Sequence, residues 1–309
     1  MKITSKALAK SFAILAVGAV ALTGCTTASQ QQPSSSSHGS ASFDPTTVAK
    51  DDTLAAAVPE AIKSRGTLII GADTSYAPAE FLGGSDGRTP LGYDVDLGKA
   101  IAATLGLKLD VQTADFNGIL PALGSKYDLG ISSFTITKER LDAVNMVSYF
   151  NAGVLWAVAK GNPKNFSLDD VCGKSIGVQT GTVEADDVTA RSKKCTDAGK
   201  PAVNIVSLAK QADVTTRLAN GGLDAMSADS PVTRYAISQT GDKLETLGEE
   251  TDAAQQGIAV AKSDTAFAEV IAKVLNKLMA DGNYKKVLES WSNTAGAIDK
   301  AVVNPAAAS

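Results

Sequence analysis

The stretch Thr67-Leu-Ile-Ile-Gly-Ala72 is a short apolar run, and a series of polar residues follows it directly. A run of this length and composition is typical of a strand that is buried on both faces of a sheet. Helical spacing then predicts a helix over 93–105, which ends at Gly106, and a second apolar run predicts a strand over 107–112. Strands that alternate with helices indicate an α/β fold with a mostly parallel sheet.

The same alternation continues along the chain and restarts after Pro163. The patterns predict strands over 128–132, 175–179, 203–208, 223–227 and 257–262, and helices over 52–65, 119–123, 139–145, 211–219, 265–280 and 283–292. Two segments, 120–133 and 216–229, match weakly: each has a helix end, a turn, an apolar-Asp pair, a strand and small polar residues. This weak repeat suggests two lobes of similar construction.

The composition narrows the possible functions. The chain has 309 residues, with 29 Lys+Arg, 33 Asp+Glu and a single histidine. The length allows about two domains. The charge balance provides no basic field for nucleic acid, so no nucleic-acid partner is expected. One histidine excludes the usual His-rich metal cages, and we expect no metal site, no cofactor and no catalytic residue.

The N-terminus has the layout of an export signal. Lys2, Lys6 and Lys10 precede an apolar stretch over 12–22, which is too short for an ordinary membrane-spanning helix. The stretch ends in Leu22-Thr-Gly-Cys25, which resembles a bacterial lipobox. The resemblance implies a lipoprotein signal peptide over 1–24, cleaved before Cys25, and lipidation of the Cys25 sulfur. The alternative is cleavage elsewhere, with Cys25 incidental.

Loss of residues 1–24 would lower Lys+Arg from 29 to 26 against 33 acids, so the mature chain would carry a net charge of −7. Residues 25–50 are rich in Ser and Gln and predict a flexible tether, which includes the single histidine, His38. Acyl chains on Cys25 would anchor the protein to the cell membrane on its extracytoplasmic side.

Two further cysteines, Cys172 and Cys195, remain in the folded part of the chain. Because an exported protein meets oxidising conditions, these two residues predict a disulfide. The alternative is a pair of free buried thiols.

Ligands of open α/β sheets bind beyond the carboxyl ends of the strands, so the residues that follow each predicted strand are candidates for a site. The candidates are Asp73, Tyr76, Phe116, Ser132, Ser133, Thr135, Arg140, Thr182 and Asp229. Arg140 offers a planar fork for a carboxylate, and Asp229 can hold an ammonium group. An ammonium beside a carboxylate is an α-amino acid. Taken singly, these residues could also be ordinary turn and cap formers.

Five motifs carry a family resemblance. They are Gly71-Ala-Asp-Thr-Ser-Tyr-Ala-Pro78, Leu91-Gly-Tyr-Asp-Val-Asp-Leu97, Ile131-Ser-Ser-Phe-Thr-Ile-Thr-Lys-Glu-Arg140, Gly177-Val-Gln-Thr-Gly-Thr182 and Leu223-Asp-Ala-Met-Ser-Ala-Asp229. In this order, over about 60–292, the chain resembles the polar amino acid substrate-binding proteins of ABC importers. The resemblance implies a two-lobed type II periplasmic-binding-protein fold with the ligand cleft between the lobes.

The same resemblance implies how the chain divides. Two crossover strands, near 153–160 and 253–260, would join the lobes. Lobe 1 would then be discontinuous, with residues 51–153 and 259–309, and lobe 2 would consist of 154–258.

By resemblance, Arg140 binds the α-carboxylate of the ligand, assisted by Thr135 and the amides near Thr182. Asp229 binds the α-ammonium, with Ser133 nearby.

The remaining candidates would surround the ligand's side chain. Tyr76 and Phe116 would flank it, and Asp73 and Ser132 would line its region, with Asp73 at a position that faces a cationic side chain in some family members. Val183 and Ala79 depart from frequent family residues, a second hydroxyl and an aromatic respectively, and so affect the shape of the pocket.

The sequence therefore predicts a monomeric, non-enzymatic amino acid receptor that delivers a polar ligand, basic or amide, to an ABC permease in the membrane. One alternative is a secreted dehydratase on the same fold, with Glu80 as its general acid. The other is a sensor that passes the amino acid signal to a membrane kinase.

Overall fold

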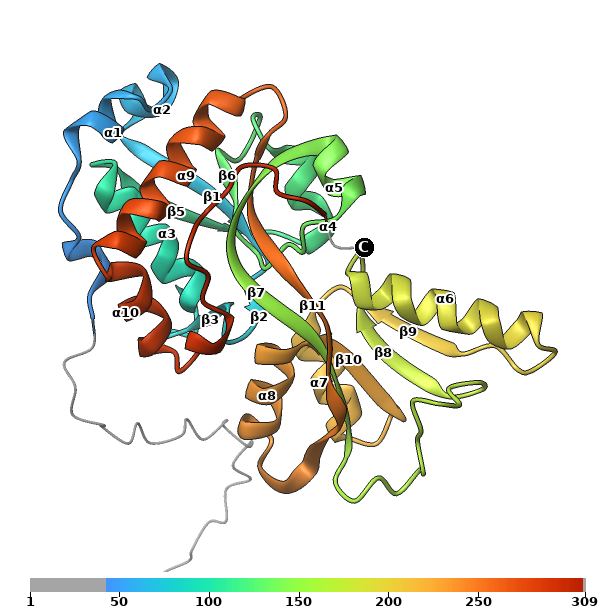
Figure 1. The fold of residues 1–309 in the computed structure, drawn as a ribbon. Helices are drawn as coiled ribbons and strands as arrows, with labels where there is room; N and C mark the ends of the chain where they lie inside the picture. Colours follow the sequence, from blue (N-terminus) through green and yellow to red (C-terminus); the bar gives the residue numbers. More distant parts are fainter. Residues whose placement is uncertain (1–42, 308–309) are drawn as a thin grey trace, which may run out of the picture. The chain divides into compact units, whose positions relative to one another are not determined.

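A computed structural model describes residues 43–307 of the chain (Figure 1). The predicted signal peptide, Cys25 and most of the predicted tether lie outside these residues. The described part contains an eight-stranded sheet in the order β5-β1-β6-β11-β7-β10-β8-β9 and a three-stranded sheet in the order β2-β3-β4. None of its helices is long and apolar enough to cross a membrane.

The two ends of the large sheet are built alike. In the first, β1 (Thr67–Ala72) lies between β5 (Lys108–Thr113) and β6 (Leu129–Gly130), and all three strands are parallel. In the second, β8 (Ser175–Gln179) lies between β9 (Asn204–Leu208) and β10 (Ala225–Asp229), again in parallel. The expectation of two similarly constructed halves is confirmed by this strand order.

The weak sequence repeat has a physical basis in its aspartates. Asp128 Oδ2 accepts a hydrogen bond from the Ile69 amide at 2.7 Å, and Asp224 Oδ2 accepts one from the Ser175 amide at 2.7 Å. Each aspartate also pairs with a cation, Arg65 in the first half and Lys164 in the second. The aspartate of the repeat therefore accepts the same kind of hydrogen bond in both halves, from a backbone amide of β1 in the first half and of β8 in the second.

Two long antiparallel strands connect the halves. They are β7 (Val144–Ala159) and β11 (Leu244–Ala261), which lie side by side in Figure 1. They make the sheet mixed rather than mostly parallel. The predicted strand over 257–262 covers only the buried end of β11, because the preceding part of β11 is largely exposed and polar. The predicted helix over 139–145 is wrong at its end, since β7 begins at Val144.

The strands pass between the halves where their pairing is irregular. β7 pairs with β11 at Ser148 on the first-half side, and β10 pairs with β7 from Val154 on the second-half side. Register shifts occur in β11 between Leu247 and Thr251, between Thr251 and Ala254, and between Gln256 and Gly257.

Proline and local packing alter two predicted helices. The helix expected over 52–65 is divided into α1 (Asp52–Ala56) and α2 (Glu60–Arg65), because Pro59 lacks an N–H and disfavours helical backbone in the residue before it. The helix expected over 119–123 begins earlier, as α4 (Phe116–Ile119), and continues as the 3₁₀ turn η2 (Leu120–Ala122).

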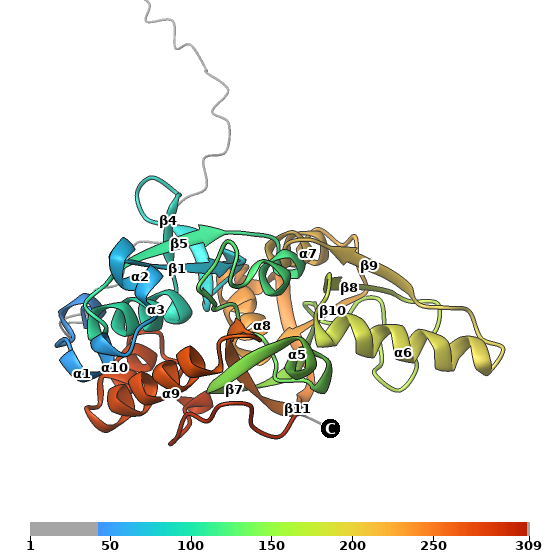
Figure 2. The same cartoon turned by 90° about the horizontal axis from the view of Figure 1, so that it is seen from above.

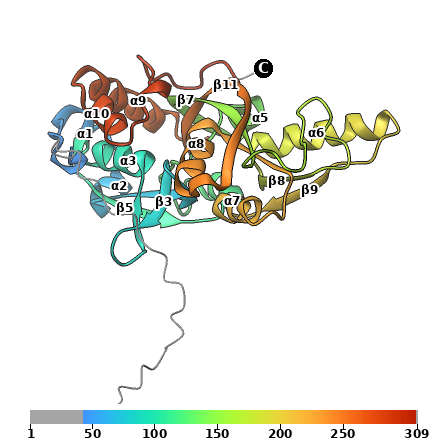
Figure 3. The same ribbon diagram turned by 90° about the horizontal axis from the view of Figure 1, so that it is seen from below.

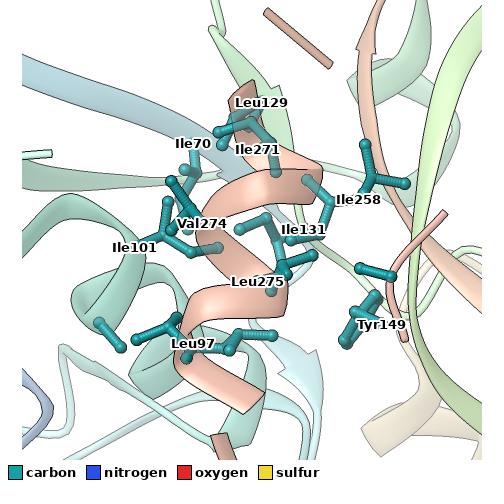
Figure 4. Close-up of a cluster of buried hydrophobic side chains, with 14 of the residues drawn as sticks. Ile70, Leu97, Ile101, Leu129, Ile131, Tyr149, Ile258, Ile271, Val274 and Leu275 are labelled. Atoms are coloured by element: carbon teal, nitrogen blue, oxygen red, sulfur yellow. The ribbon is translucent and has the colours of Figure 1, made fainter. Parts of the chain in front are cut away.

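Three helices pack together in the first half: α3 (Tyr93–Thr104), α9 (Thr265–Ala280) and α10 (Asn283–Ser290). The core places side chains of α9 among those of the sheet and α3 (Figure 4). The residues labelled there are Ile70, Leu97, Ile101, Leu129, Ile131, Tyr149, Ile258, Ile271, Val274 and Leu275. Burial of such aliphatic side chains contributes about 1.5–3 kcal/mol each.

The second half has helices on both faces of its strands. Figures 2 and 3 show α6 (Val183–Asp197) and α7 (Gln211–Ala219) on opposite sides of β8, and α8 (Ser230–Gln239) follows β10 directly. The smaller elements of the chain are η1 (Pro45–Thr47), β2 (Ser75–Tyr76), β3 (Glu80–Gly83), β4 (Thr89–Leu91), α5 (Lys138–Ala143), η3 (Gly241–Lys243) and η4 (Thr294–Gly296).

A disulfide joins Cys172 to Cys195 near the end of α6, with a Cα–Cα distance of 5.5 Å. It closes a loop with a sequence separation of 23 residues, which restricts the unfolded chain. We expect the free energy of unfolding of the Cys172→Ala, Cys195→Ala double variant to be about 3 kcal/mol lower than that of the oxidised wild type. Chemical denaturation measures this difference, and reduced wild-type protein is the control. An unchanged denaturation midpoint would contradict a stabilising role for the bond.

Candidate binding cleft

A small cavity, of about 10 Å³, lies where the carboxyl ends of strands from both halves meet. The predicted site residues that line it are Tyr76, Phe116, Ser133, Thr135, Arg140, Thr182 and Asp229. Val183, which was expected to affect the shape of the pocket, also lines it. Gln179 and Glu184 line it as well, and the sequence reasoning assigned neither of them to the site. The predicted residues Asp73 and Ser132 are buried but are not part of this lining.

Arg140 is fixed from several sides. It lies in the first turn of α5, where Thr137 caps the helix and accepts a hydrogen bond from the Arg140 amide at 3.2 Å. Its guanidinium donates to the carbonyl of Thr135 at 2.8 Å and to that of Gly181 at 3.1 Å. A guanidinium has five N–H donors, so this arrangement leaves the group able to bind a carboxylate as well.

Two aromatic rings stack below the Arg140 guanidinium. The rings of Phe116 and Phe134 are 4.7 Å apart, and the guanidinium carbon lies 5.4 Å and 5.7 Å from their respective centroids. Burial lowers the pKa of Arg140, and the carboxyl groups of Glu184 and Asp229 oppose this shift. Cation–π contact and nearby acids both favour the charged guanidinium in a partly buried position.

The start of α6 forms a second wall of the cavity. Thr182 caps this helix: its Oγ1 accepts from the Ala185 amide at 3.2 Å and donates to the Gln179 carbonyl at 2.9 Å. Gly181 has a φ of +81°, and a Cβ at this position would lie 1.6 Å from Asn117 Oδ1. Only glycine fits here, and the helix start therefore closely approaches α4. Amides at a helix N-terminus favour an anion.

Asp229 occupies the end of β10. Its Oδ2 accepts hydrogen bonds from the Tyr76 hydroxyl at 3.0 Å and from Gln256 Nε2 at 2.9 Å. Burial raises the pKa of Asp229 well above its usual range, and the nearby Glu184 carboxyl raises it further. A carboxyl group in this setting gains most from a bound cation, because the cation offsets the cost of its buried charge.

Asp73 lies behind the lining, and its hydrogen-bonding capacity is largely used. Oδ1 accepts from the amide and hydroxyl of Ser75 at 3.1 Å and 2.7 Å. Oδ2 accepts from the Phe116 amide at 3.2 Å and from Gln179 Nε2 at 2.8 Å. Burial raises the pKa of Asp73, while the bonds from Ser75 and Phe116 lower it. Gln179 therefore occupies the side of Asp73 that faces the second half.

A pair of buried acids supports the floor of the cavity. Ser132 Oγ donates to Glu80 Oε1 at 2.7 Å, and Asp94 Oδ2 accepts from the Ser133 amide at 3.0 Å and the Tyr149 hydroxyl at 2.8 Å. Both carboxyl groups are fully buried. Burial raises the pKa of Asp94 to about 6. Burial and the nearby charge of Asp94 together raise the pKa of Glu80 well above its usual range. Burial therefore favours the protonated form of both groups.

Replacement of Asp94 by asparagine should change how stability depends on pH. Because the folded protein holds the Asp94 proton more tightly than the unfolded chain, the contribution of Asp94 to the free energy of unfolding falls as the pH rises from 3.8 to about 6. The Asp94→Asn variant has no such proton, so its free energy of unfolding should fall by about 3 kcal/mol less than that of wild type over this pH range. Urea denaturation at several pH values measures the slope, with the exposed Glu139→Gln variant as control. Equal slopes for wild type and Asp94→Asn would contradict the assignment.

Three side chains in or beside the cavity escaped the sequence reasoning for identifiable reasons. Glu184 follows the cap residue of α6, where an acid is common simply because it suits the helix dipole. Gln256 belongs to the part of β11 that the apolar pattern does not reveal. Gln179 ends β8 and reaches Asp73 across the cavity, a contact that no local pattern encodes.

The fold and the cleft define a class of protein. Two α/β halves joined by two long strands, with a cavity lined from both, form a two-lobed substrate-binding protein of type II. The chain belongs to the bacterial extracellular solute-binding proteins, family 3, whose family model matches residues 68–294. The predicted family and fold class are confirmed, and the family's members are extracellular binding proteins.

Similar proteins occur in several bacteria. The arginine-binding protein ArgT of Corynebacterium glutamicum is 34% identical over 253 residues, which is 81% of this chain and 82% of the relative. The L-cystine-binding protein TcyJ of Escherichia coli K12 is 27% identical over 236 residues, 74% of this chain and 84% of the relative. A solved ancestral arginine-binding protein bound to arginine is 36% identical, with a TM-score of 0.67 over 74% of this chain and 98% of its own.

Proposed function

We propose that this protein captures a polar amino acid outside the cytoplasm and delivers it to an ABC permease in the membrane. The observation that carries the proposal is the presence of Arg140 and Asp229 in the lining of one cavity. The guanidinium suits an α-carboxylate and the buried carboxyl suits an α-ammonium. Thr135 and the start of α6 would assist with the carboxylate, and Ser133 would lie near the ammonium. Tyr76 and Phe116 would flank the ligand's side chain.

Closure of the lobes on the ligand is the mechanism we propose. We assign 51–153 with 259–309 to one lobe and 154–258 to the other. Hydrogen bonds would then cross the cleft from Tyr76 to Asp229, from Gln179 to Asp73, and from Arg140 to the Gly181 carbonyl. A ligand that contacts both lobes binds the closed form better, and so shifts the population towards it.

Arginine is the first ligand to test. Two similar proteins are described as binding arginine, the relative from C. glutamicum and the ancestral protein. An amide such as glutamine is the second. The test is a thermal-shift screen of the twenty amino acids, because a ligand that binds only the folded state raises the melting temperature with its concentration. A protein whose melting temperature responds to no amino acid would contradict the proposed function.

We also propose that the chain is anchored to the membrane through a lipid on Cys25, after cleavage of residues 1–24, and that it acts as a monomer. The net charge of −7 and the Ser/Gln-rich segment fit an exported, tethered protein. Mass spectrometry of the N-terminal peptide from the membrane fraction tests the anchor. Permease and ATPase genes beside this one would favour transport over the sensor alternative.

The dehydratase alternative depends on an acid that reaches the substrate. Glu80, its predicted general acid, is fully buried, accepts a hydrogen bond from Ser132, and is not part of the cavity lining. We therefore propose a binding role without catalysis. Incubation of the purified protein with arogenate or prephenate tests this, and formation of product would overturn it.

A further inference from the structure

We propose that Glu184 is the residue that selects ligands with a cationic side chain, by pairing its carboxylate with the ligand's guanidinium or ammonium. The inference rests on the proposed function and adds to it a specificity residue that lies in the second lobe. It also moves the cation-selecting role away from Asp73, the residue at which the family resemblance places it.

The surroundings of Glu184 support this role. It lies in the first turn of α6, lines the cavity, and is 2% exposed. Its Oε1 atom is buried and has no hydrogen-bond partner among the described residues. A buried carboxylate oxygen without a partner is costly, so the site is incomplete until a donor arrives.

The other two acids of the cleft are already engaged. Asp73 accepts four hydrogen bonds and does not line the cavity. Asp229 accepts from Tyr76 and Gln256, and the proposed function uses it for the α-ammonium. Glu184 is therefore the acid that remains for a second positive group on the ligand.

The charges of the lining lead to the same ligand class. The lining contains the acids Glu184 and Asp229 and the single cation Arg140. An amino acid with a neutral side chain brings one positive and one negative charge and leaves the ionised site with one acid in excess. A guanidinium or ammonium on the side chain balances this charge, and a buried charge is stable only when it is paired.

The unpartnered atoms have the matching polarity. Besides Glu184 Oε1, Gln256 Oε1 is buried and without a partner among the described residues. Gln256 is not part of the cavity lining, but its amide nitrogen donates to Asp229, which is. Both atoms accept hydrogen bonds. A guanidinium has five N–H donors and no acceptor, so it suits a site that has acceptors to spare.

A second explanation for Glu184 is that it only supports Arg140. Arginine and citrulline separate the two roles, because they have the same shape and differ in the charge of the side-chain end group. Loss of support for Arg140 would weaken the binding of both ligands equally, since both carry the α-carboxylate. Loss of a partner for the side-chain cation would weaken arginine alone.

The experiment is isothermal titration calorimetry of the full folded chain with arginine and with citrulline. We expect wild type to prefer arginine, and Glu184→Gln to weaken arginine binding by about 10- to 100-fold. Citrulline binding should change less than about threefold. Asp186→Asn is the matched control, because it removes the same charge from an exposed position in the same helical turn, and it should leave both affinities unchanged.

Each other outcome overturns the inference. Equal weakening of both ligands in Glu184→Gln would overturn the selecting role and leave the proposed function intact. Equal affinity of wild type for arginine and citrulline would do the same, and this measurement needs no variant. Wild type that binds no amino acid at all would overturn the proposed function and the inference with it. A thermal melt of Glu184→Gln shows whether the variant is folded.

Discussion

Replacement of Arg140 by alanine should weaken amino acid binding at least about 100-fold and close to the limit of detection. The ligand's α-carboxylate would lose its partner inside a nearly closed cavity, and an unpaired buried charge costs about 3–5 kcal/mol. The variant would also lose the bond from the guanidinium to the Gly181 carbonyl, which joins the two sides of the cleft. Calorimetry with the ligand from the thermal-shift screen measures the effect.

The matched control for Arg140 is Lys138, in the same helix. Lys138 is exposed and pairs with Asp142 at 2.8 Å on the surface, so Lys138→Ala should leave the dissociation constant unchanged. Arg140→Lys should bind weakly, because an ammonium cannot make the two parallel bonds of a guanidinium fork. An unchanged affinity of Arg140→Ala would refute the role assigned to the residue.

Replacement of Asp229 by asparagine should weaken binding by about 100-fold. The side chain keeps its size, and its oxygen can still accept from Tyr76, but it cannot carry the charge that holds an α-ammonium. Burial raises the pKa of Asp229 well above its usual range, so burial disfavours the charged carboxylate in the protein without ligand. The free energy of unfolding without ligand should therefore change little.

This combination separates a binding role from a structural one. Calorimetry measures affinity and urea denaturation measures stability for the same Asp229→Asn sample. The control is Asp213→Asn, which removes an acid from an exposed position in α7. A large loss of stability with unchanged affinity would show that Asp229 serves the fold and not the ligand.

The sequence predicted the buried parallel strands best. The strands β1 and β8 and the helices α7 and α9 have the predicted bounds, because each shows a complete apolar pattern between clear end signals. The first part of β11 was missed because it is largely exposed, and its pairing with β7 is decided by residues about 100 positions away. An apolar periodicity appears only where side chains are buried, and few side chains of this segment are buried.

The sequence also predicted which residues lie near the cavity, but not all of the contacts they make. Tyr76 and Asp229, which were expected to follow predicted strands, line the cavity because strand ends of both halves meet there. Asp73 has the same kind of position, but hydrogen bonds from Phe116 and Gln179 hold it behind the lining. Such a difference depends on the contacts between distant segments, which the order of residues along one strand does not show.

The irregular pairing of β7 with β11 has a kinetic consequence. Between Leu247 and Gly257 the register shifts three times, and Asp252 takes a positive φ of 52°, so few regular ladder bonds must break when the strands bend there. The barrier to opening would then arise mainly from bonds across the cleft, such as that from Tyr76 to Asp229. We expect the residence time of a ligand to follow the strength of those bonds. Tyr76→Phe should therefore release the ligand faster than wild type, while its free energy of unfolding changes little.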